Sequence, residues 1–198
     1  MDKNKRSGIF GGTFNPPHIG HLEIAREAKA RFGLDRVFFV PSFMPPHKDP
    51  KSVVDGTHRA NMVKLLIDGA PDLVLSEYEI SKKNVSYSID TVRFFETEFP
   101  DTKFYFIIGS DAFYAIDTWK ESGKIQKIID FIIYERKGTP KAKISEKFPD
   151  LRNISWIENR YINLSSSDIR KQMHTGVNET EDLGSRVYKY IEEHQLYK

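Results

Sequence analysis

The sequence predicts an α/β fold in which helices cover a mostly parallel sheet. Short runs rich in β-branched and aromatic residues alternate with segments that repeat apolar residues at helical spacing. This alternation is typical of strand–helix–strand units, and two helical segments follow the last strand-like run. A chain of 198 residues with 39% apolar and 13% aromatic content can bury one sizeable core, so we expect a single domain over residues 1–198.

Six runs have the character of buried strands. Each is short, β-branched or aromatic, and bounded by turn-forming or charged residues, and six such strands suffice for one sheet. The candidate strands are residues 8–11, 37–40, 73–78, 104–108, 131–134 and 154–157.

Helices are expected between these runs, because apolar residues recur there three or four positions apart, as at Ile19, Leu22 and Ala25. The last two helices form a small C-terminal helical segment, about residues 165–198, which we expect to fold back on the sheet. The complete pattern predicts a Rossmann-like, doubly wound sheet. The expected helices cover about residues 19–32, 60–67, 88–98, 113–128, 166–174 and 180–193.

Two connections differ from the rest. Residues 42–56 contain three prolines and no helical period, which favours a mobile loop with a function. Residues 137–147 are lysine-rich, and we interpret them as a solvated surface loop.

Charge and composition exclude several classes of protein. The 30 basic and 28 acidic residues leave a formal net charge of +2, too near neutrality to indicate a nucleic acid or a membrane surface as the partner. The absence of cysteine excludes disulfides and thiolate zinc sites. No apolar run is long enough for a signal peptide or a membrane span, so a cytoplasmic protein with a small-molecule ligand is expected.

The strongest motif is GGTFNPPHIGH at residues 11–21, between the first strand and the first helix. Gly11 and Gly12 allow the backbone to turn sharply and approach a phosphate without a Cβ in the way. His18 and His21 fall in or beside the first helical turn, where free N–H groups favour anions, and their spacing places both imidazoles on one face. Two such donors can hold the α-phosphate of a nucleotide and stabilise charge that builds during attack.

Other interpretations of this motif are weaker. It lacks the Gly-Lys-Ser/Thr of a P-loop and the Gly-x-Gly-x-x-Gly of dinucleotide-binding proteins. His18 and His21 are also compatible with a helix cap and a core contact. A zinc site at these two residues finds no third ligand at a convincing spacing.

The motif resembles the nucleotidyltransferase superfamily, and its fuller form resembles the bacterial nicotinate mononucleotide adenylyltransferases. The resemblance covers nearly the whole chain, and the order and spacing of its later marks make it specific. These marks are residues 40–42, 45–48, 86–91, 107–111, 118–120, 165–170, 190–191 and 196–197.

Ser166 and Ser167 place hydroxyl groups at a helix start, and Arg170 adds a guanidinium one turn later, which indicates a second anion site. An ordinary Ser/Asp cap with a surface arginine is the alternative. The resemblance implies that this segment binds the triphosphate. Asp111, at the ligand edge of the sheet, can bind a ribose hydroxyl or cap a helix, and Arg136 either flanks the adenine or lies on the surface. The expected ATP-binding residues are Gly11, Gly12, Thr13, Phe14, His18, His21, Gly109, Asp111, Arg136, Ser166, Ser167, Ile169 and Arg170.

The resemblance also implies an acceptor site. It places the phosphate and ribose of the mononucleotide near the proline-rich loop, the pyridine ring against a tryptophan, and the nicotinate carboxylate against a Ser-Tyr-Ser segment. From the residues alone, His47 and Lys48 are also compatible with a solvated basic loop, and Trp119 is also compatible with a core residue. The chain departs from the family at Lys82, Lys83 and Asn84 and at Ser88, which bears on the preference for acid over amide. The expected acceptor-binding residues are Asn15, His47, Lys48, Ser86, Tyr87, Ser88 and Trp119.

The implied reaction is in-line transfer of AMP from ATP to nicotinate mononucleotide, with His18, His21 and Arg170 as catalytic residues. Mg²⁺ would be held by the substrate phosphates and water, with no protein metal ligand. The alternatives are a transferase of the same superfamily with another acceptor, such as nicotinamide mononucleotide, phosphopantetheine or a sugar phosphate, and a nucleotide-binding module without activity. The sequence leaves open whether the chain forms a homo-oligomer.

Overall fold

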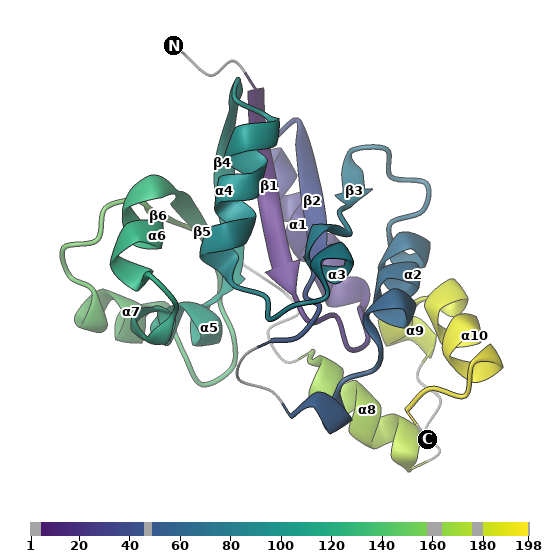
Figure 1. The fold of residues 1–198 in the computed structure, drawn as a ribbon. Coiled ribbons are helices and arrows are strands. Elements are labelled where there is room, and N and C mark those ends of the chain that lie inside the picture. The colour runs from purple at the N-terminus through teal and green to yellow at the C-terminus, as the bar shows by residue number, and fades with distance from the viewer. Residues whose placement is uncertain (1–4, 46–48, 158–163, 176–179, 198) are drawn as a thin grey trace.

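The computed structural model describes residues 5–45, 49–157, 164–175 and 180–197. Within these residues six strands form one sheet in the order β3-β2-β1-β4-β5-β6, and every neighbouring pair is parallel (Figure 1). This order is that of a doubly wound Rossmann-like sheet, which confirms the predicted fold class. The strands are β1 (Lys5–Gly12), β2 (Arg36–Pro41), β3 (Leu73–Leu75), β4 (Thr102–Gly109), β5 (Asp130–Tyr134) and β6 (Ile154–Ile157).

Helices cover both faces of the sheet because successive strand residues point to opposite sides. On one side Phe38 and Phe106 contribute to a core with helices α4 to α7, and on the other their neighbours Phe39 and Ile107 pack in a core with α1 and α2. The α-helices are α1 (Ile19–Phe32), α2 (Gly56–Leu66), α3 (Tyr78–Lys82), α4 (Ser88–Glu98), α5 (Ser110–Tyr114), α6 (Ser122–Ile128), α7 (Lys141–Lys147), α8 (Ser166–His174), α9 (Thr180–Leu183) and α10 (Ser185–Glu193), and the 3-10 turns are η1 (Pro50–Ser52) and η2 (Ile116–Thr118).

Several boundaries differ from the prediction. The third strand ends at Leu75 instead of residue 78, because Tyr78 already begins α3. The helix expected over residues 113–128 is divided into α5, η2 and α6, and Glu121 adopts a left-handed backbone (φ 53°) where α6 starts. Residues 137–147 are not only a surface loop, since they contain α7, whose Ile144 is fully buried.

The C-terminal helices form a third core. Met62 and Leu66 of α2 pack there against Ile169, Leu183 and other apolar residues of α8 to α10. The expectation that this segment folds back on the sheet is therefore wrong: its apolar residues pack on helices instead, with α10 beside α2 (Figure 1). The helix expected over residues 180–193 is interrupted by Gly184, which has φ 75°. The single domain over residues 1–198 stays a prediction.

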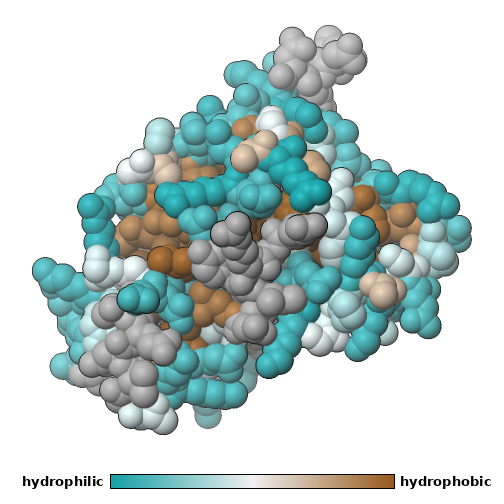
Figure 2. All heavy atoms as spheres, turned by 180° about the vertical axis from the view of Figure 1, so that it is seen from behind, coloured by the Kyte–Doolittle hydropathy of each residue, from teal (hydrophilic) through white to brown (hydrophobic). Residues whose placement is uncertain are grey.

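The rear surface is mainly hydrophilic, with hydrophobic residues visible in hollows between hydrophilic ridges (Figure 2). Among the described residues, no helix is long and apolar enough to span a membrane. The cytoplasmic location stays a prediction.

Candidate active site

The predicted motif lies where the order of the strands reverses. β1 ends at Gly12 and its neighbour β4 ends at Gly109, so the two carboxyl ends lie side by side. Helix α1 follows β1 and helix α5 follows β4 directly. In open α/β sheets this crevice is the place where ligands bind.

Other side chains closely approach the backbone at two glycines of this crevice. A Cβ on Gly11 would lie 3.2 Å from the ring of Phe106. A Cβ on Gly109 would lie 2.6 Å from the carboxylate of Asp111 and 3.1 Å from Cγ of Arg136. Larger residues would therefore displace the side chains that line the ends of β1 and β4.

His18 and His21 lie together, as their spacing predicted. The ring centroids are 3.7 Å apart and the ring planes differ by 32°. The backbone N–H of His18 donates to Nδ1 of His21 over 3.1 Å. Because Nδ1 of His21 accepts this bond, the proton of the neutral ring lies on Nε2, which is then a donor.

His18 is a buried side chain with unsatisfied polar atoms. It is 1% exposed, and neither ring nitrogen has a hydrogen-bond partner among the described residues. Burial, assisted by the charge of Arg136, lowers the pKa of His18 to about 3. The imidazole is therefore neutral at physiological pH and carries one N–H donor. A buried polar group without a partner is costly, and such groups concentrate at functional sites.

Helix α8 joins the motif from the far end of the chain. Nη1 of Arg170 donates to the carbonyl oxygen of Asn15 over 2.6 Å, and Oγ of Ser166 donates to the carbonyl oxygen of Pro16 over 2.8 Å. Nη2 of Arg170 also donates to Oγ of Ser167 over 3.3 Å. The serine–arginine segment and the histidine motif are thus brought together. Ile169, predicted to contact ATP, has its side chain in the C-terminal core.

The turn of the motif is rigid. The ring of Phe14 is 2% exposed and packs edge-on against His21, with centroids 5.0 Å apart, so it faces the core. The carbonyl oxygen of Thr13 accepts a 2.7 Å hydrogen bond from Arg59. Any contact of Phe14 with a nucleotide would consequently involve its backbone.

Asn15 has three partners for its side chain. Nδ2 donates to the carbonyl oxygen of Ser52 over 2.9 Å, and Oδ1 accepts from the amide of Val54 at 3.1 Å and the hydroxyl of Tyr197 at 2.9 Å. Asn15 therefore holds the proline-rich loop and the C-terminus to the motif. Its predicted contact with the acceptor stays a prediction.

On the other side of the crevice, β5 and α5 supply a linked polar group. Arg136 lies with Nε 3.8 Å from Oδ2 of Asp111 and donates from Nη1 to the carbonyl oxygen of Leu164 over 2.8 Å. Oδ1 of Asp111 accepts from the amide of Ala112. Ser110, which sequence reasoning missed, is fully buried and accepts from the amide of Arg136 over 2.9 Å. The sequence signal that could have identified Ser110 as a site residue was its position directly after a strand.

The predicted acceptor residues lie on neighbouring segments. The ammonium of Lys120 lies 4.4 Å from the ring centroid of Tyr87, so the segments of Trp119 and Tyr87 are adjacent. Trp119 is half-buried, and its ring packs edge-on against Phe106, which also approaches Gly11.

The structure describes two of the four remaining predicted acceptor residues. Oγ of Ser86 accepts from the amide of Phe43 over 2.9 Å, and half-buried Ser88 is the first residue of α4. His47 and Lys48 lie outside the described residues.

Two buried charged residues, Arg59 and Glu79, were missed. Arg59 is 0% exposed and Glu79 is 8% exposed. The only sequence signal for the burial of Arg59 was its position next to Ala60 on the apolar side of α2. Nothing in the sequence distinguishes Glu79 from an exposed glutamate.

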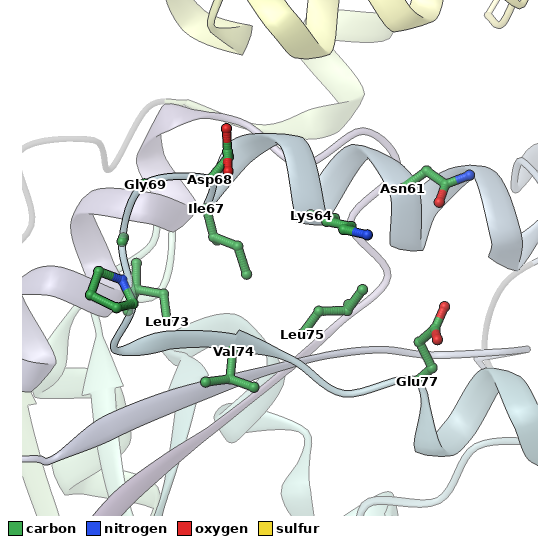
Figure 3. A pocket seen from close by; sticks show the side chains of 11 residues that line it. Asn61, Lys64, Ile67, Asp68, Gly69, Leu73, Val74, Leu75 and Glu77 are labelled. Carbon is green, nitrogen blue, oxygen red and sulfur yellow. The ribbon is translucent and has the colours of Figure 1, made fainter.

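A separate hollow of about 580 Å³ lies between α2 and the edge strand β3 (Figure 3). Its lining includes Lys64, Leu73 and Glu77, and it shares no residue with the motif or with the predicted substrate-binding sets. We therefore place the candidate active site at the strand ends and not in this hollow.

Comparisons with known proteins show which family the chain is similar to. Residues 9–172 match the family model described as Cytidylyltransferase-like. A protein of Clostridium botulinum (strain Eklund 17B / Type B), named "Probable nicotinate-nucleotide adenylyltransferase", is 37% identical over 201 residues, covering 98% of each chain. A protein of Lactiplantibacillus plantarum with the same name is 36% identical over 195 residues, covering 98% of this chain and 89% of the relative.

Solved structures show the same fold. The nicotinic acid mononucleotide adenylyltransferase of Plasmodium falciparum, complexed with NaAD, superposes with a TM-score of 0.82 at 24% identity and with 98% coverage of both chains. A second structure of that protein, complexed with APC, gives a TM-score of 0.80.

Proposed function

The chain belongs to the cytidylyltransferase-like family and to the nicotinate-nucleotide adenylyltransferases within it, and we propose that it transfers the adenylyl group of ATP to nicotinate mononucleotide. The products are nicotinate adenine dinucleotide and pyrophosphate, and the reaction is a step of NAD biosynthesis. The observation that carries this proposal is the pair of adjacent imidazoles at the carboxyl end of β1, one of them buried with no hydrogen-bond partner in the described part of the chain.

The chemistry follows from the hydrogen-bond donors that these side chains offer. A phosphate oxygen of the acceptor attacks the α-phosphorus of ATP, a new P–O bond forms, and the bond to pyrophosphate breaks. Neutral His18 would present an N–H donor to the non-bridging oxygens, which gain charge in the transition state, and His21 would act beside it. No covalent intermediate is required, because positioning and charge stabilisation supply the rate.

Helix α8 would bind the β- and γ-phosphates. Ser166 and Ser167 begin this nine-residue helix, whose N-terminus favours anions. The hydrogen bond from Arg170 to Asn15 keeps the guanidinium at the motif. Gly109, Asp111 and Arg136 form the remaining wall, where we place the ribose and adenine.

The acceptor would lie between the Tyr87 and Trp119 segments. Trp119 offers an aromatic face for the pyridine ring, and the ammonium of Lys120 lies over the Tyr87 ring and 3.4 Å from Oδ2 of Asp90. The names of the relatives support nicotinate over nicotinamide as the acceptor.

A divalent cation, Mg²⁺, would accompany ATP. Among the described residues, no three His, Asp or Glu side chains gather where they could hold a metal ion, whereas imidazole, guanidinium and hydroxyl donors suit phosphate oxygens. Mg²⁺ bound with nucleotides is usually coordinated by the phosphates and water, and there it would supply positive charge beside the phosphate oxygens.

Isotope labelling tests the proposal. With ATP labelled at the α-phosphate and nicotinate mononucleotide as the acceptor, the label should appear in the dinucleotide, whereas label at the γ-phosphate should appear in pyrophosphate. Label that remains on the protein would contradict direct transfer, and binding of ATP without any product would favour the inactive nucleotide-binding alternative.

A further inference from the structure

Arg59 is a buried charged side chain that contacts the backbone of the motif and has no part in the proposed reaction. It lies near the start of α2 and is 0% exposed, the largest of the fully buried side chains in the described part of the chain. An arginine is buried only where its charge and its donors are satisfied.

Its guanidinium binds three segments at once. Nε donates to the carbonyl oxygen of Val54 over 2.7 Å, Nη1 to that of Thr13 over 2.7 Å, and Nη2 to that of Phe43 over 3.0 Å. The planar fork of arginine suits three acceptors in fixed directions, whereas a lysine ammonium is a point charge on a flexible stem. Arg59 therefore joins the glycine turn to both ends of the connection that follows β2.

Other residues hold the same segments. Phe43 is fixed at both of its backbone groups, because its carbonyl accepts from Arg59 and its amide donates to Oγ of Ser86. Asn15 holds Val54 from the side of the motif. The carbonyl of Thr13 belongs to the ATP half of the site, and Ser86 belongs to the acceptor half.

Nearby acids compensate the buried charge. Burial lowers the pKa of the Arg59 guanidinium, while the carboxylates of Asp55 and Glu79 act in the opposite direction. Glu79 is itself fixed, since its Oε1 accepts a 2.5 Å hydrogen bond from Oγ1 of Thr91. An arginine remains protonated throughout the working pH range, so the link does not depend on pH.

We propose that Arg59 is a positioning residue that fixes the ATP half of the site relative to the acceptor half. It touches neither substrate and acts through the backbones of Thr13, Phe43 and Val54. The inference rests on the proposed function, because it assigns the two halves by their substrates. Loss of the link should misplace the reacting groups, and a displacement of 1 Å costs roughly a hundredfold in rate.

The test is chemical rescue of Arg59→Ala. We expect kcat/KM to fall about a hundredfold, with a higher KM for the acceptor and a lower kcat. Guanidinium ion should restore at least a tenth of the lost activity, because it fits the space left by the side chain, whereas methylammonium should not. Arg59→Lys should remain impaired, since a lysine cannot reach three carbonyl groups from one position.

The matched control is Met62→Ala. Met62 is also 0% exposed on α2, but it packs in the C-terminal core. This variant should lose thermal stability and keep the wild-type KM. Wild-type kcat/KM in Arg59→Ala, or no response of a folded Arg59→Ala to guanidinium, would overturn the proposal. If Arg59→Ala does not fold, wild-type kinetics in Arg59→Lys would overturn it equally.

A second measurement separates this inference from the proposed function. The rise in melting temperature caused by ATP should shrink in Arg59→Ala and Arg59→Lys but not in Met62→Ala, whether or not the wild-type protein turns over. A wild-type protein without turnover would defeat the proposed function, whereas an unchanged ATP shift in both Arg59 variants would defeat the role of Arg59.

Discussion

The guanidinium of Arg170 donates a 2.6 Å hydrogen bond to the backbone carbonyl of Asn15, which lies 155 positions earlier in the chain. The bond joins the middle of α8 to the turn between β1 and α1. The two segments consequently meet at one crevice, which neither could form alone.

Replacement of Arg170 should therefore impair the reaction more than folding. We expect Arg170→Met to lower kcat by roughly 10²- to 10³-fold, because one preorganised charge donor is lost. Arg152→Met is the control, since Arg152 is exposed in the connection between α7 and β6, where its guanidinium donates to the carbonyl oxygen of Pro149. Steady-state rates of pyrophosphate release measure both variants, and equal rates would refute the role of Arg170.

Removal of His18 should cost about 2.7 to 4 kcal/mol in the barrier, which is the effect of losing one transition-state donor. His18→Ala should thus turn over roughly 10²- to 10³-fold more slowly. His174→Ala serves as the control because His174 is exposed at the end of α8. Near-normal turnover of folded His18→Ala would contradict the assignment.

The pH dependence of stability should reveal His18. Its pKa falls from 6.5 to about 3 on folding, so below 6.5 the unfolded chain binds a proton that the folded protein does not. The contribution of neutral His18 to stability is thus present above pH 6.5 and is lost as the pH falls toward 3, by about 1.4 kcal/mol per pH unit. Urea unfolding between pH 6.5 and 3 should show that the free energy of unfolding declines less steeply with falling pH in His18→Gln than in the wild-type protein. Parallel curves for the two proteins would disprove the shift.

The C-terminus should contribute stability through Tyr197. Its hydroxyl donates to Oδ1 of Asn15, and burial raises its pKa, so it remains a donor. Tyr197→Phe should lower the free energy of unfolding by roughly 0.5 to 1.5 kcal/mol. Tyr114→Phe, at a residue that is 41% exposed, should have almost no effect. Denaturant titration compares them, and equal stabilities would argue against the link.

Local spacing carried most of what could be predicted. The strands followed from runs of β-branched and aromatic residues, and the pairing of His18 with His21 followed from their three-residue separation. The contact of Arg170 with the motif is different, because it spans most of the chain and only the resemblance placed the two segments in one site.

Tertiary contacts explain what was missed. Ile144 is buried although lysines surround it in the sequence, because one apolar residue is enough to attach a short helix to the core. Arg59 is buried because three carbonyl groups from distant segments meet at one point, which no local pattern encodes. The packing of the C-terminal helices on α2 instead of the sheet likewise depends on surfaces that exist only after folding.

The most direct test of the central claim is the initial rate of pyrophosphate release with ATP and Mg²⁺, measured side by side with nicotinate mononucleotide and nicotinamide mononucleotide. The proposed site predicts rapid release with the nicotinate form and much slower release with the nicotinamide form. Equal rates would contradict the acid-specific acceptor site, and no release with either would contradict adenylyl transfer itself.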